Sequence, residues 1–383
     1  MNDNIRPFTI EIEQQELDDL RQRIANTRWP EAETCKGWDQ GVPLDYAREL
    51  ADYWLNDYDW RRCEDMLNRW PNFKTSIDGL DIHFIHRLSP HPDALPLIIS
   101  HGWPGSVIEF HKIIDALADP VAYGGKASDA FHVIAPSLPG YGFSDKPATT
   151  GMSVEKIGKL WGKLMARLGY DRYVAQGGDW GSMITQSIGQ TETTHCTGIH
   201  INMPIVAPDP DTMADLSLAE EQALTDMAHY SDKESGYSKQ QATRPQTLGY
   251  GLADSPVGQM AWIAEKFHGW TDCEQDGVKH PENVITRDEL LDNIMLYWLN
   301  NCAACSARLY WESFDNPKLD PIEMPVGCSI FPQEIFRSSK RWAEKRYANL
   351  IYWNELDKGG HFAALEQPET FVREVRACFR LLR

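Results

Sequence analysis

The chain has 383 residues, 42% of them hydrophobic and 24% charged, which suits a large globular domain with insertions. Its net charge of −19 argues against a nucleic-acid partner, because phosphate binding needs clustered lysine and arginine. No apolar segment is long enough to span a bilayer and residues 1–8 do not resemble a secretory signal, so we expect a cytoplasmic protein without a membrane anchor.

The first seventy residues favour helices and connections rather than a sheet. Residues 13–24 carry apolar side chains at helical spacing, and Arg28-Trp29-Pro30 ends that helix, since proline disfavours helical geometry at the residue before it. A second helix is predicted over 44–55. We therefore expect residues 1–70 to form a separate region that packs on a core.

After Pro71 the pattern changes to alternating strands and helices. Asp78-Gly79 between two apolar runs predicts a hairpin of residues 73–77 and 80–88. Further strands are predicted at 97–100, 131–135, 173–175 and 197–202, and helices at 106–117, at 154–168 and from 182. Repeated strand-then-helix units predict a mostly parallel sheet covered by helices on both faces, an α/β fold.

The alternation stops at Met203-Pro204 and returns near residue 326. The block between is helical in pattern, including 294–299 and 303–309. Strands at 326–331 and 350–353 and helices at 338–346 and from 369 follow it. The predicted organisation is an N-terminal region (1–70), a first core part (71–204), a helical lid (205–315) and a second core part (316–383).

The most informative motif is Gly177-Gly178-Asp179-Trp180-Gly181-Ser182. It follows a predicted strand and opens a helix, with small residues where a sharp nucleophile turn needs them. Asp179 stands where many enzymes of this kind place serine, at a helix start that favours an anion. A common loop with an N-capping aspartate is the alternative interpretation of the motif alone.

A nucleophilic aspartate needs a general base and an orienting acid, because a carboxylate attacks saturated carbon and leaves an alkyl ester that water must hydrolyse. His361, in a Gly-Gly-His-Phe segment after the last predicted strand, is the predicted base. Glu334, just after the preceding strand, is the predicted acid, and Asp357 and Glu355 compete with it by proximity. Nucleophile, acid and base stand in the expected chain order.

The oxyanion site should combine two backbone N–H groups. One follows the nucleophile, from Trp180, and the other comes from the His101-Gly102-Trp103-Pro104-Gly105 loop, where Trp103 is the predicted donor. A plain turn would also explain these glycines. The Trp103 and Trp180 side chains fit an apolar pocket.

With these residues in place, the chain resembles the microsomal-type epoxide hydrolases of the α/β-hydrolase superfamily over nearly its whole length. The matching segments are His-Gly-Trp-Pro at 101–104, Gly-Tyr-Gly-Phe-Ser at 140–144, Gly-Gly-Asp-Trp-Gly at 177–181, Asp-Ser-Pro-Val-Gly at 254–258 and Gly-Gly-His-Phe-Ala-Ala at 359–364. The resemblance implies an α/β-hydrolase fold with a mostly parallel central sheet, a helical lid insertion and an N-terminal wrapping region.

The resemblance also implies the substrate and two phenols. Tyr237 and Tyr310 match the lid tyrosines that hold the oxygen of an epoxide, while Asp179 attacks a ring carbon. Water activated by His361 and Glu334 then releases a vicinal diol. A small apolar epoxide is the expected partner and no cofactor is needed, because ring strain makes the substrate electrophilic.

The start of the chain departs from the mammalian relatives, which carry a hydrophobic anchor, so a soluble bacterial-type member is expected. The sequence leaves the assembly state open, with a homodimer among the options. Eight cysteines, with Cys302-x-x-Cys305 lacking a second pair, and scattered histidines predict no metal.

Two other functions stay open at this point. A haloalkane or haloacid dehalogenase would use the same aspartate nucleophile, with Trp180 beside it to hold halide, but would need no pair of phenols. A non-catalytic ligand-binding protein would keep the fold, since fold does not guarantee function.

Overall fold

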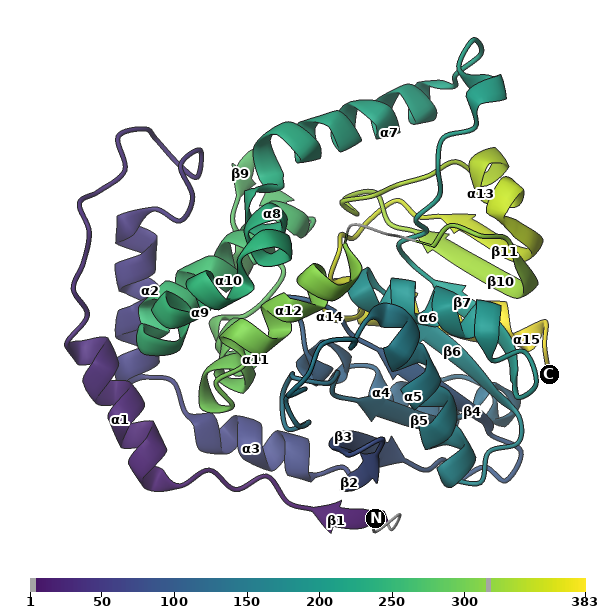
Figure 1. The fold of residues 1–383 in the computed structure, drawn as a ribbon, viewed down its shortest axis with the longest axis horizontal. Helices are drawn as coiled ribbons and strands as arrows, with labels where there is room; N and C mark the ends of the chain where they lie inside the picture. The colour runs from purple at the N-terminus through teal and green to yellow at the C-terminus, as the bar shows by residue number, and fades with distance from the viewer. Residues whose placement is uncertain (1–4, 315–317) are drawn as a thin grey trace.

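The computed structural model describes residues 5–314 and 318–383, and one mixed sheet organises this part of the chain (Figure 1). Its nine strands lie in the order β1-β2-β3-β5-β4-β6-β7-β10-β11. Their bounds are β1 Arg6–Phe8, β2 Asn72–Ile77, β3 Leu80–Arg87, β4 Leu95–Ser100, β5 Phe131–Pro136, β6 Tyr173–Gly177, β7 Cys196–Ile201, β10 Ile322–Ile330 and β11 Tyr347–Glu355.

Strands β5 to β11 of this order pair in parallel, whereas β1, β2 and β3 form an antiparallel edge. The mostly parallel sheet is therefore as predicted. The predicted hairpin is β2–β3, and its turn has positive φ at both Asp78 and Gly79, as a two-residue hairpin turn requires. Strand β1 was not predicted, because three residues are too short to show a period.

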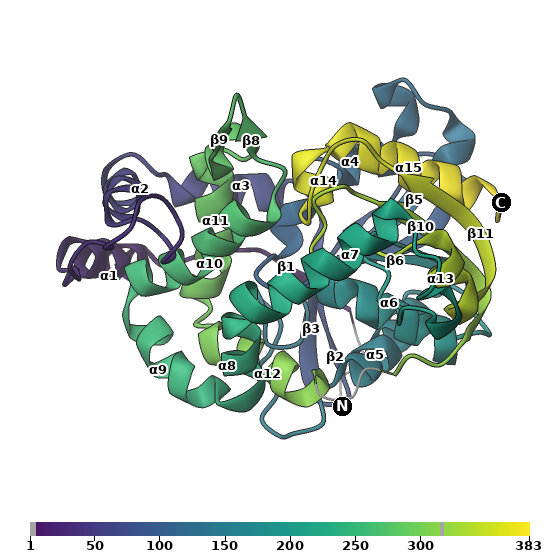
Figure 2. The same ribbon diagram turned by 90° about the horizontal axis from the view of Figure 1, so that it is seen from above.

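Helices cover both faces of the sheet, as Figure 2 shows. The helices α4 (Ile114–Ala118) and α15 (Pro368–Arg380) pack together on one face, and α5 (Val154–Arg167) and α6 (Asp179–Thr191) on the other. The apolar stripes of α5 and α15 face inward, as amphipathic helices on a sheet require.

Two helix predictions need correction. The helix predicted over 106–117 is a short 3₁₀ turn, Val107–Phe110, followed by α4. Packing of that turn against α11 (Arg287–Leu299) and α14 (Ala363–Glu366) decides the backbone there. Helix α6 begins at Asp179 rather than near Ser182, so the nucleophile candidate is the first helical residue. The remaining core helix is α13 (Lys340–Arg346), which packs on β11.

A helical insertion lies between β7 and β10, as predicted. Its helices are α7 Leu218–His229, α8 Gly236–Thr243, α9 Pro245–Asp254, α10 Pro256–Trp270, α11 Arg287–Leu299 and α12 Ala303–Ser313. A small hairpin of β8 (Glu274–Gln275) and β9 (Val278–Lys279) adds an unpredicted element. The predicted boundary between lid and core, at residues 315 and 316, lies outside the described residues, and the four-part division stays a prediction.

The N-terminal region connects the lid to the core. Its helices are α1 Gln14–Ala25, α2 Leu44–Asn56 and α3 Trp60–Asn68, and Figure 1 shows them in purple beside the lid helices. Both α1 and α2 pack on α10, and α3 packs on α11. The buried Asp292 of α11 accepts hydrogen bonds from the Tyr58 hydroxyl at 2.7 Å and from Arg62 at 2.6 Å. This region therefore positions the lid from outside. Along the described residues, no helix combines the length and apolarity that a bilayer crossing needs.

Candidate active site

The elbow between β6 and α6 holds Asp179 in an unusual backbone conformation. Its φ is +50°, a left-handed value that non-glycine residues adopt rarely and that marks functional strain. A Cβ built on Gly177 would lie 2.1 Å from the carbonyl oxygen of Gly181, and one on Gly181 would lie 2.0 Å from that of Ser100. Only glycine fits at both positions, so the glycines serve the sharp turn that lifts Asp179 above the sheet.

The two oxygens of the Asp179 carboxylate have different neighbours. Oδ1 accepts a hydrogen bond from the Trp103 backbone N–H at 2.8 Å. Oδ2 lies 3.1 Å from Nε2 of His361. A Cβ on Gly102 would lie 2.0 Å from Oδ1, so the loop before Trp103 reaches the carboxylate only because Gly102 has no side chain. The carboxylate is thus held at both oxygens, by a backbone N–H on one side and by the imidazole on the other.

Of the two predicted oxyanion donors, only one bonds to Asp179 in the resting site. The Trp103 N–H already contacts Oδ1, as just described. For the Trp180 N–H, the described residues contain no such bond, and its role stays a prediction. An oxyanion donor must fit the position of the tetrahedral oxygen rather than of the resting carboxylate, so the resting geometry does not decide this role.

His361 lies between two carboxylates. Its Nδ1 is 2.5 Å from Oε1 of Glu334, which also accepts the Ile335 backbone N–H at 2.8 Å. Glu334, and not Asp357 or Glu355, is therefore the acidic residue that touches the imidazole, and Glu355 instead accepts a bond from the Trp353 indole at 2.9 Å.

The loop that carries His361 is fixed through its backbone. The His361 N–H donates to the Trp270 carbonyl oxygen at 2.9 Å. The buried carboxyl of Glu366 accepts from the N–H groups of Gly360 at 3.1 Å and Phe362 at 2.9 Å, the two residues that flank the histidine. These bonds set the position of the imidazole before any substrate binds, which is the pre-organisation that catalysis uses.

The protonation of His361 follows from its neighbours. Burial by itself lowers the pKa of the imidazole, but the charges and hydrogen bonds of Glu334 and Asp179 outweigh burial and raise that pKa well above 6.5. The resting site therefore holds an imidazolium between two carboxylates.

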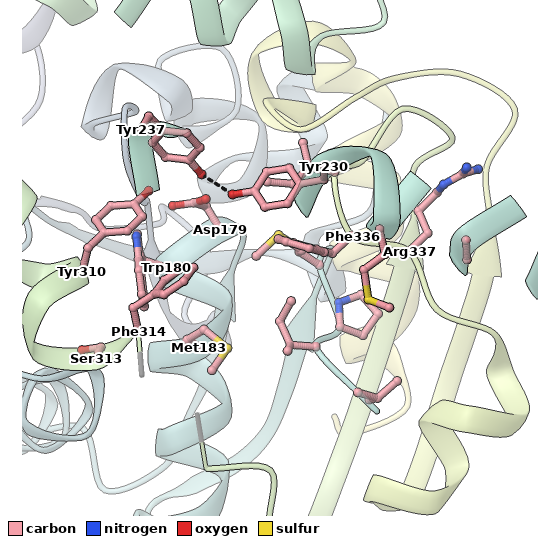
Figure 3. A pocket seen from close by; sticks show the side chains of 17 residues that line it. Asp179, Trp180, Met183, Tyr230, Tyr237, Tyr310, Ser313, Phe314, Phe336 and Arg337 are labelled. Atoms are coloured by element: carbon pink, nitrogen blue, oxygen red, sulfur yellow. Dashed lines mark hydrogen bonds between the residues drawn. The ribbon is translucent and has the colours of Figure 1, made fainter. Parts of the chain in front are cut away.

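Two lid tyrosines reach over Asp179 from different helices, Tyr237 from α8 and Tyr310 from α12 (Figure 3). Their ring centroids are 5.8 Å apart. The Trp103 ring stacks on Tyr237 at 5.0 Å, and the Trp180 ring meets Tyr310 edge-on at 4.8 Å. Burial raises the pKa of both phenols well above 10, and the Asp179 charge raises both further, so both are protonated donors at neutral pH.

A cavity of about 280 Å³ opens beside Asp179, and Figure 3 shows the side chains around it. Asp179, Tyr230, Tyr237 and Tyr310 meet at one end of it, and Arg337 lies at the other end. Its walls are mainly apolar side chains, namely Met183, Met203, Ile205, Val206, Met227, Phe314, Ile335 and Phe336. An apolar pocket with a few convergent polar groups is typical of a site for a small apolar molecule.

Three polar residues adjoin this site although no motif points to them. The Tyr230 hydroxyl lies 2.8 Å from that of Tyr237, and Lys266 lies over the Tyr237 ring with Nζ 4.5 Å from its centroid. Glu109 packs on the loop that carries Trp103, and burial raises the pKa of its carboxyl to about 8. Tyr230 precedes Tyr237 by seven residues across an irregular π-helical turn and is one of fourteen tyrosines, so no motif marks it.

The described residues contain no group of three or more His, Cys, Asp or Glu side chains arranged to hold a metal ion. Cys302 and Cys305 are free, buried thiols at the start of α12.

Comparison with known families gives two matches. Residues 5–110 match the family described as epoxide hydrolase N terminus, and residues 96–246 match the alpha/beta hydrolase fold. A protein of Stigmatella aurantiaca named as a candidate epoxide hydrolase is 55% identical over 383 residues, 99% of this chain and 86% of that protein. Epoxide hydrolase 1 of Sus scrofa is 36% identical, with coverage of 100% and 90%.

Solved structures agree with these matches. The juvenile hormone epoxide hydrolase of the silkworm Bombyx mori superimposes with a TM-score of 0.91 at 32% identity, over 100% of this chain and 96% of that one. The epoxide hydrolase of Aspergillus niger gives 0.89 at 30% identity, over 99% and 97%. The α/β-hydrolase fold expected from the sequence is thereby confirmed.

Proposed function

This chain belongs to the epoxide hydrolase family, and we propose that it converts a small apolar epoxide and water to a vicinal diol through an ester of Asp179. One observation carries the proposal. A single carboxylate has one oxygen on a backbone N–H, the other beside an imidazole, and two buried phenols over it (Figure 3). That arrangement provides a nucleophile, a base and an acid for opening a strained ring.

The first half-reaction alkylates the enzyme. Asp179 Oδ2 forms a bond to a ring carbon as the bond from that carbon to the ring oxygen breaks, and the electron pair stays on the oxygen. Tyr237 and Tyr310 donate hydrogen bonds to this oxygen, and a proton from a phenol completes the first hydroxyl. The phenols act where charge develops, so they stabilise the transition state more than the substrate.

The second half-reaction hydrolyses the ester. His361, oriented by Glu334, takes a proton from a water that attacks the ester carbon, and the Trp103 and Trp180 N–H groups hold the developing oxyanion. The bond to the alkyl oxygen breaks, and His361 returns its proton to that oxygen, which becomes the second hydroxyl. The other proton of the water restores the phenol, so epoxide and water balance with diol.

The rate of ester hydrolysis should depend on pH through His361. In the resting enzyme two carboxylates raise the pKa of this imidazole. Once Asp179 is an uncharged ester only Glu334 remains, so the pKa must fall, and the neutral base appears when the second half-reaction needs it. We expect the hydrolysis rate constant, measured by acid-quenching the ester, to rise with pH and level off above this lower pKa.

The matched variant for this experiment is Glu334→Gln. It removes the remaining carboxylate charge, so the midpoint should move to lower pH while the plateau rate also decreases. A hydrolysis rate independent of pH between about pH 5 and 9 would contradict the role of His361 as base.

The test of the function itself is a single turnover in ¹⁸O-water, with enzyme in excess over styrene oxide. We expect an unlabelled diol, because its new oxygen comes from the Asp179 carboxylate. A labelled diol would mean that water attacks the epoxide directly and that the ester route is wrong. Multiple turnovers serve as the control, since they must introduce label once the carboxylate has exchanged its oxygen.

The same assay separates the two alternatives. A dehalogenase would release halide from haloalkanes and form no diol from epoxides, but the two phenols over Asp179 favour an alkoxide rather than a halide. A binding protein would retain the epoxide unchanged. The complete set of nucleophile, imidazole, acid and phenols at one cavity supports catalysis over both.

Location and assembly remain predictions from the sequence. A cytoplasmic protein is expected, and a homodimer is one of the assembly states to be distinguished. Light scattering of the purified chain would separate monomer from dimer. Neither outcome alters the chemistry proposed above, because every residue in it comes from one chain.

A further inference from the structure

The two lid phenols are not equivalent in their surroundings. Tyr237 shares a hydrogen bond with a third phenol, Tyr230, at 2.8 Å between the hydroxyl oxygens (Figure 3). The ammonium of Lys266 lies over its ring, 4.5 Å from the centroid. Tyr310 instead packs edge-on against the indole of Trp180. The lid therefore places a hydroxyl and an ammonium beside one phenol of the pair and an indole beside the other.

Tyr230 reaches Tyr237 through an irregular turn of the lid. It begins a π-helical turn, Tyr230–Glu234, between α7 and α8, and such turns are frequent at functional sites. Its ring packs against Phe336 at 4.7 Å and lines the substrate cavity, with 8% of the residue exposed. Its hydroxyl can donate to Tyr237 while the proton of Tyr237 points toward the cavity.

Lys266 is unusual because it is a buried lysine. Only 3% of the residue is exposed, and its Nζ lies 2.8 Å from Oε1 of Glu265. The same ammonium lies 5.8 Å from the centroid of the Trp270 ring, so it faces two aromatic rings. Burial of a charged amine costs free energy unless a neighbouring group compensates the charge. A cation over an aromatic face attracts its electron density, and more strongly when that ring becomes anionic.

Resting on the proposed function, we propose that Tyr237 is the phenol that transfers its proton to the opening ring oxygen, with Tyr230 and Lys266 as positioning residues that stabilise the resulting phenolate. Tyr310 then serves as a hydrogen-bond donor that keeps its proton. The lid thus assigns the two phenols different tasks.

The proton balance of this step is complete. As the carbon–oxygen bond of the ring breaks, the O–H proton of Tyr237 moves to the ring oxygen, and the phenolate of Tyr237 accepts the O–H of Tyr230. No other reactant is needed. A water proton restores the phenol during ester hydrolysis. A chain of two phenols polarises cooperatively, which strengthens the bond just when charge develops.

A double-mutant cycle tests the link between Tyr230 and Tyr237. The alkylation rate constant is measured by rapid quenching and intact mass in Tyr230→Phe, Tyr237→Phe and the double variant. Tyr230→Phe should slow alkylation about tenfold in the natural enzyme, as expected for losing a hydrogen bond to a charged group, and under twofold in a Tyr237→Phe background. In a Tyr310→Phe background the tenfold effect should remain.

The same variant separates positioning from a structural effect. Tyr230→Phe should leave the rate constant of ester hydrolysis and substrate affinity unchanged, because phenolate stabilisation concerns only the first half-reaction. Tyr250→Phe, on α9 with 71% of the residue exposed, is the matched control and should change neither step. Equal slowing of both half-reactions by Tyr230→Phe would overturn the inference.

The role of Lys266 is tested by removing or keeping its positive charge. Lys266→Met keeps an apolar stem and should slow alkylation about tenfold, whereas Lys266→Arg keeps a cation over the ring and should restore most of the rate. If Lys266→Met fails to fold, the double-mutant cycle of Tyr230 and Tyr237 still tests whether Tyr237 is the proton donor.

The failure of the inference is distinguishable from failure of the function. If the enzyme without substitutions forms no ester, both the proposed function and the assignment of Tyr237 as the proton donor are overturned. The assignment alone is overturned if the enzyme is active and Tyr230→Phe does not slow alkylation. It is also overturned if Tyr230→Phe slows alkylation equally in the natural enzyme, in Tyr237→Phe and in Tyr310→Phe.

Discussion

Replacement of His361 by glutamine is expected to stop the reaction after one covalent event per enzyme molecule. Attack by Asp179 needs no base, because the carboxylate is already a nucleophile, so the ester should still form. Hydrolysis of that ester needs an activated water, which glutamine cannot provide. Steady-state diol formation should decrease by roughly 10⁴-fold.

The measurement is the intact mass of the protein after incubation with styrene oxide and acid quench. His361→Gln should gain the mass of one epoxide, located by peptide mapping on the segment that contains Asp179. The matched control is His229→Gln on α7, whose side chain is 65% exposed and which should keep natural turnover and show no lasting adduct. Loss of turnover without any adduct would show that His361 is needed before the ester and would refute the assignment.

Glutamine is chosen because of the neighbours of the imidazole. His361 meets Glu334 on one side and Asp179 on the other. The amide N–H groups of glutamine can still donate to these carboxylates, which limits the cost of leaving them without a donor, although the positive charge between them is lost. Thermal unfolding of the variant therefore has to accompany the assay, so that the chemical defect is separated from a loss of stability.

The second large effect is expected for Asp179→Ala. Without a carboxylate at the elbow no ester can form, so diol production should decrease by about 10⁵-fold and the protein mass should not change with epoxide. Alanine at a φ of +50° carries a backbone cost of about 1–2 kcal/mol, which the fold must absorb. Thermal unfolding of the variant therefore has to accompany the assay.

The control for this variant is Asp215→Ala, a carboxylate whose side chain is 95% exposed and which should leave activity unchanged. The decisive comparison is with His361→Gln, since one variant should trap the ester and the other should never form it. Rapid diol formation by Asp179→Ala, with oxygen from the solvent in the first turnover, would mean that water attacks the ring directly and that the elbow is not the nucleophile.

Much of the fold followed from local rules that act along the chain. The turn at Asp78-Gly79, the short buried strands and the amphipathic stripe of α5 each depend on neighbours within a few residues, and all were predicted close to their bounds. The 3₁₀ turn Val107–Phe110 was not, because its side chains show a helical spacing while its backbone follows α11 and α14. Local propensity yields to tertiary packing at such places.

The catalytic candidates divide in the same way. Asp179 could be recognised because an elbow needs glycines at fixed offsets, and His361 because a glycine pair precedes it after the last strand. Glu334 could not be separated from Asp357 and Glu355 by spacing, and the structure brings only Glu334 to the imidazole. The lid tyrosines came from family resemblance, since nothing local distinguishes a tyrosine that faces a cavity.

By itself the sequence determined the α/β class, the helical insertion and the elbow at Asp179, because each depends on short spacings that a chain must keep to fold. The family followed from the resemblance of its motifs. Only the tertiary structure decided what surrounds the reacting groups. The contact of Tyr230 with Tyr237 crosses an irregular π-helical turn, and Lys266 reaches the same ring from another lid helix, so neither contact carries a periodic signal. Such contacts arise only when the segments of the lid fold against one another.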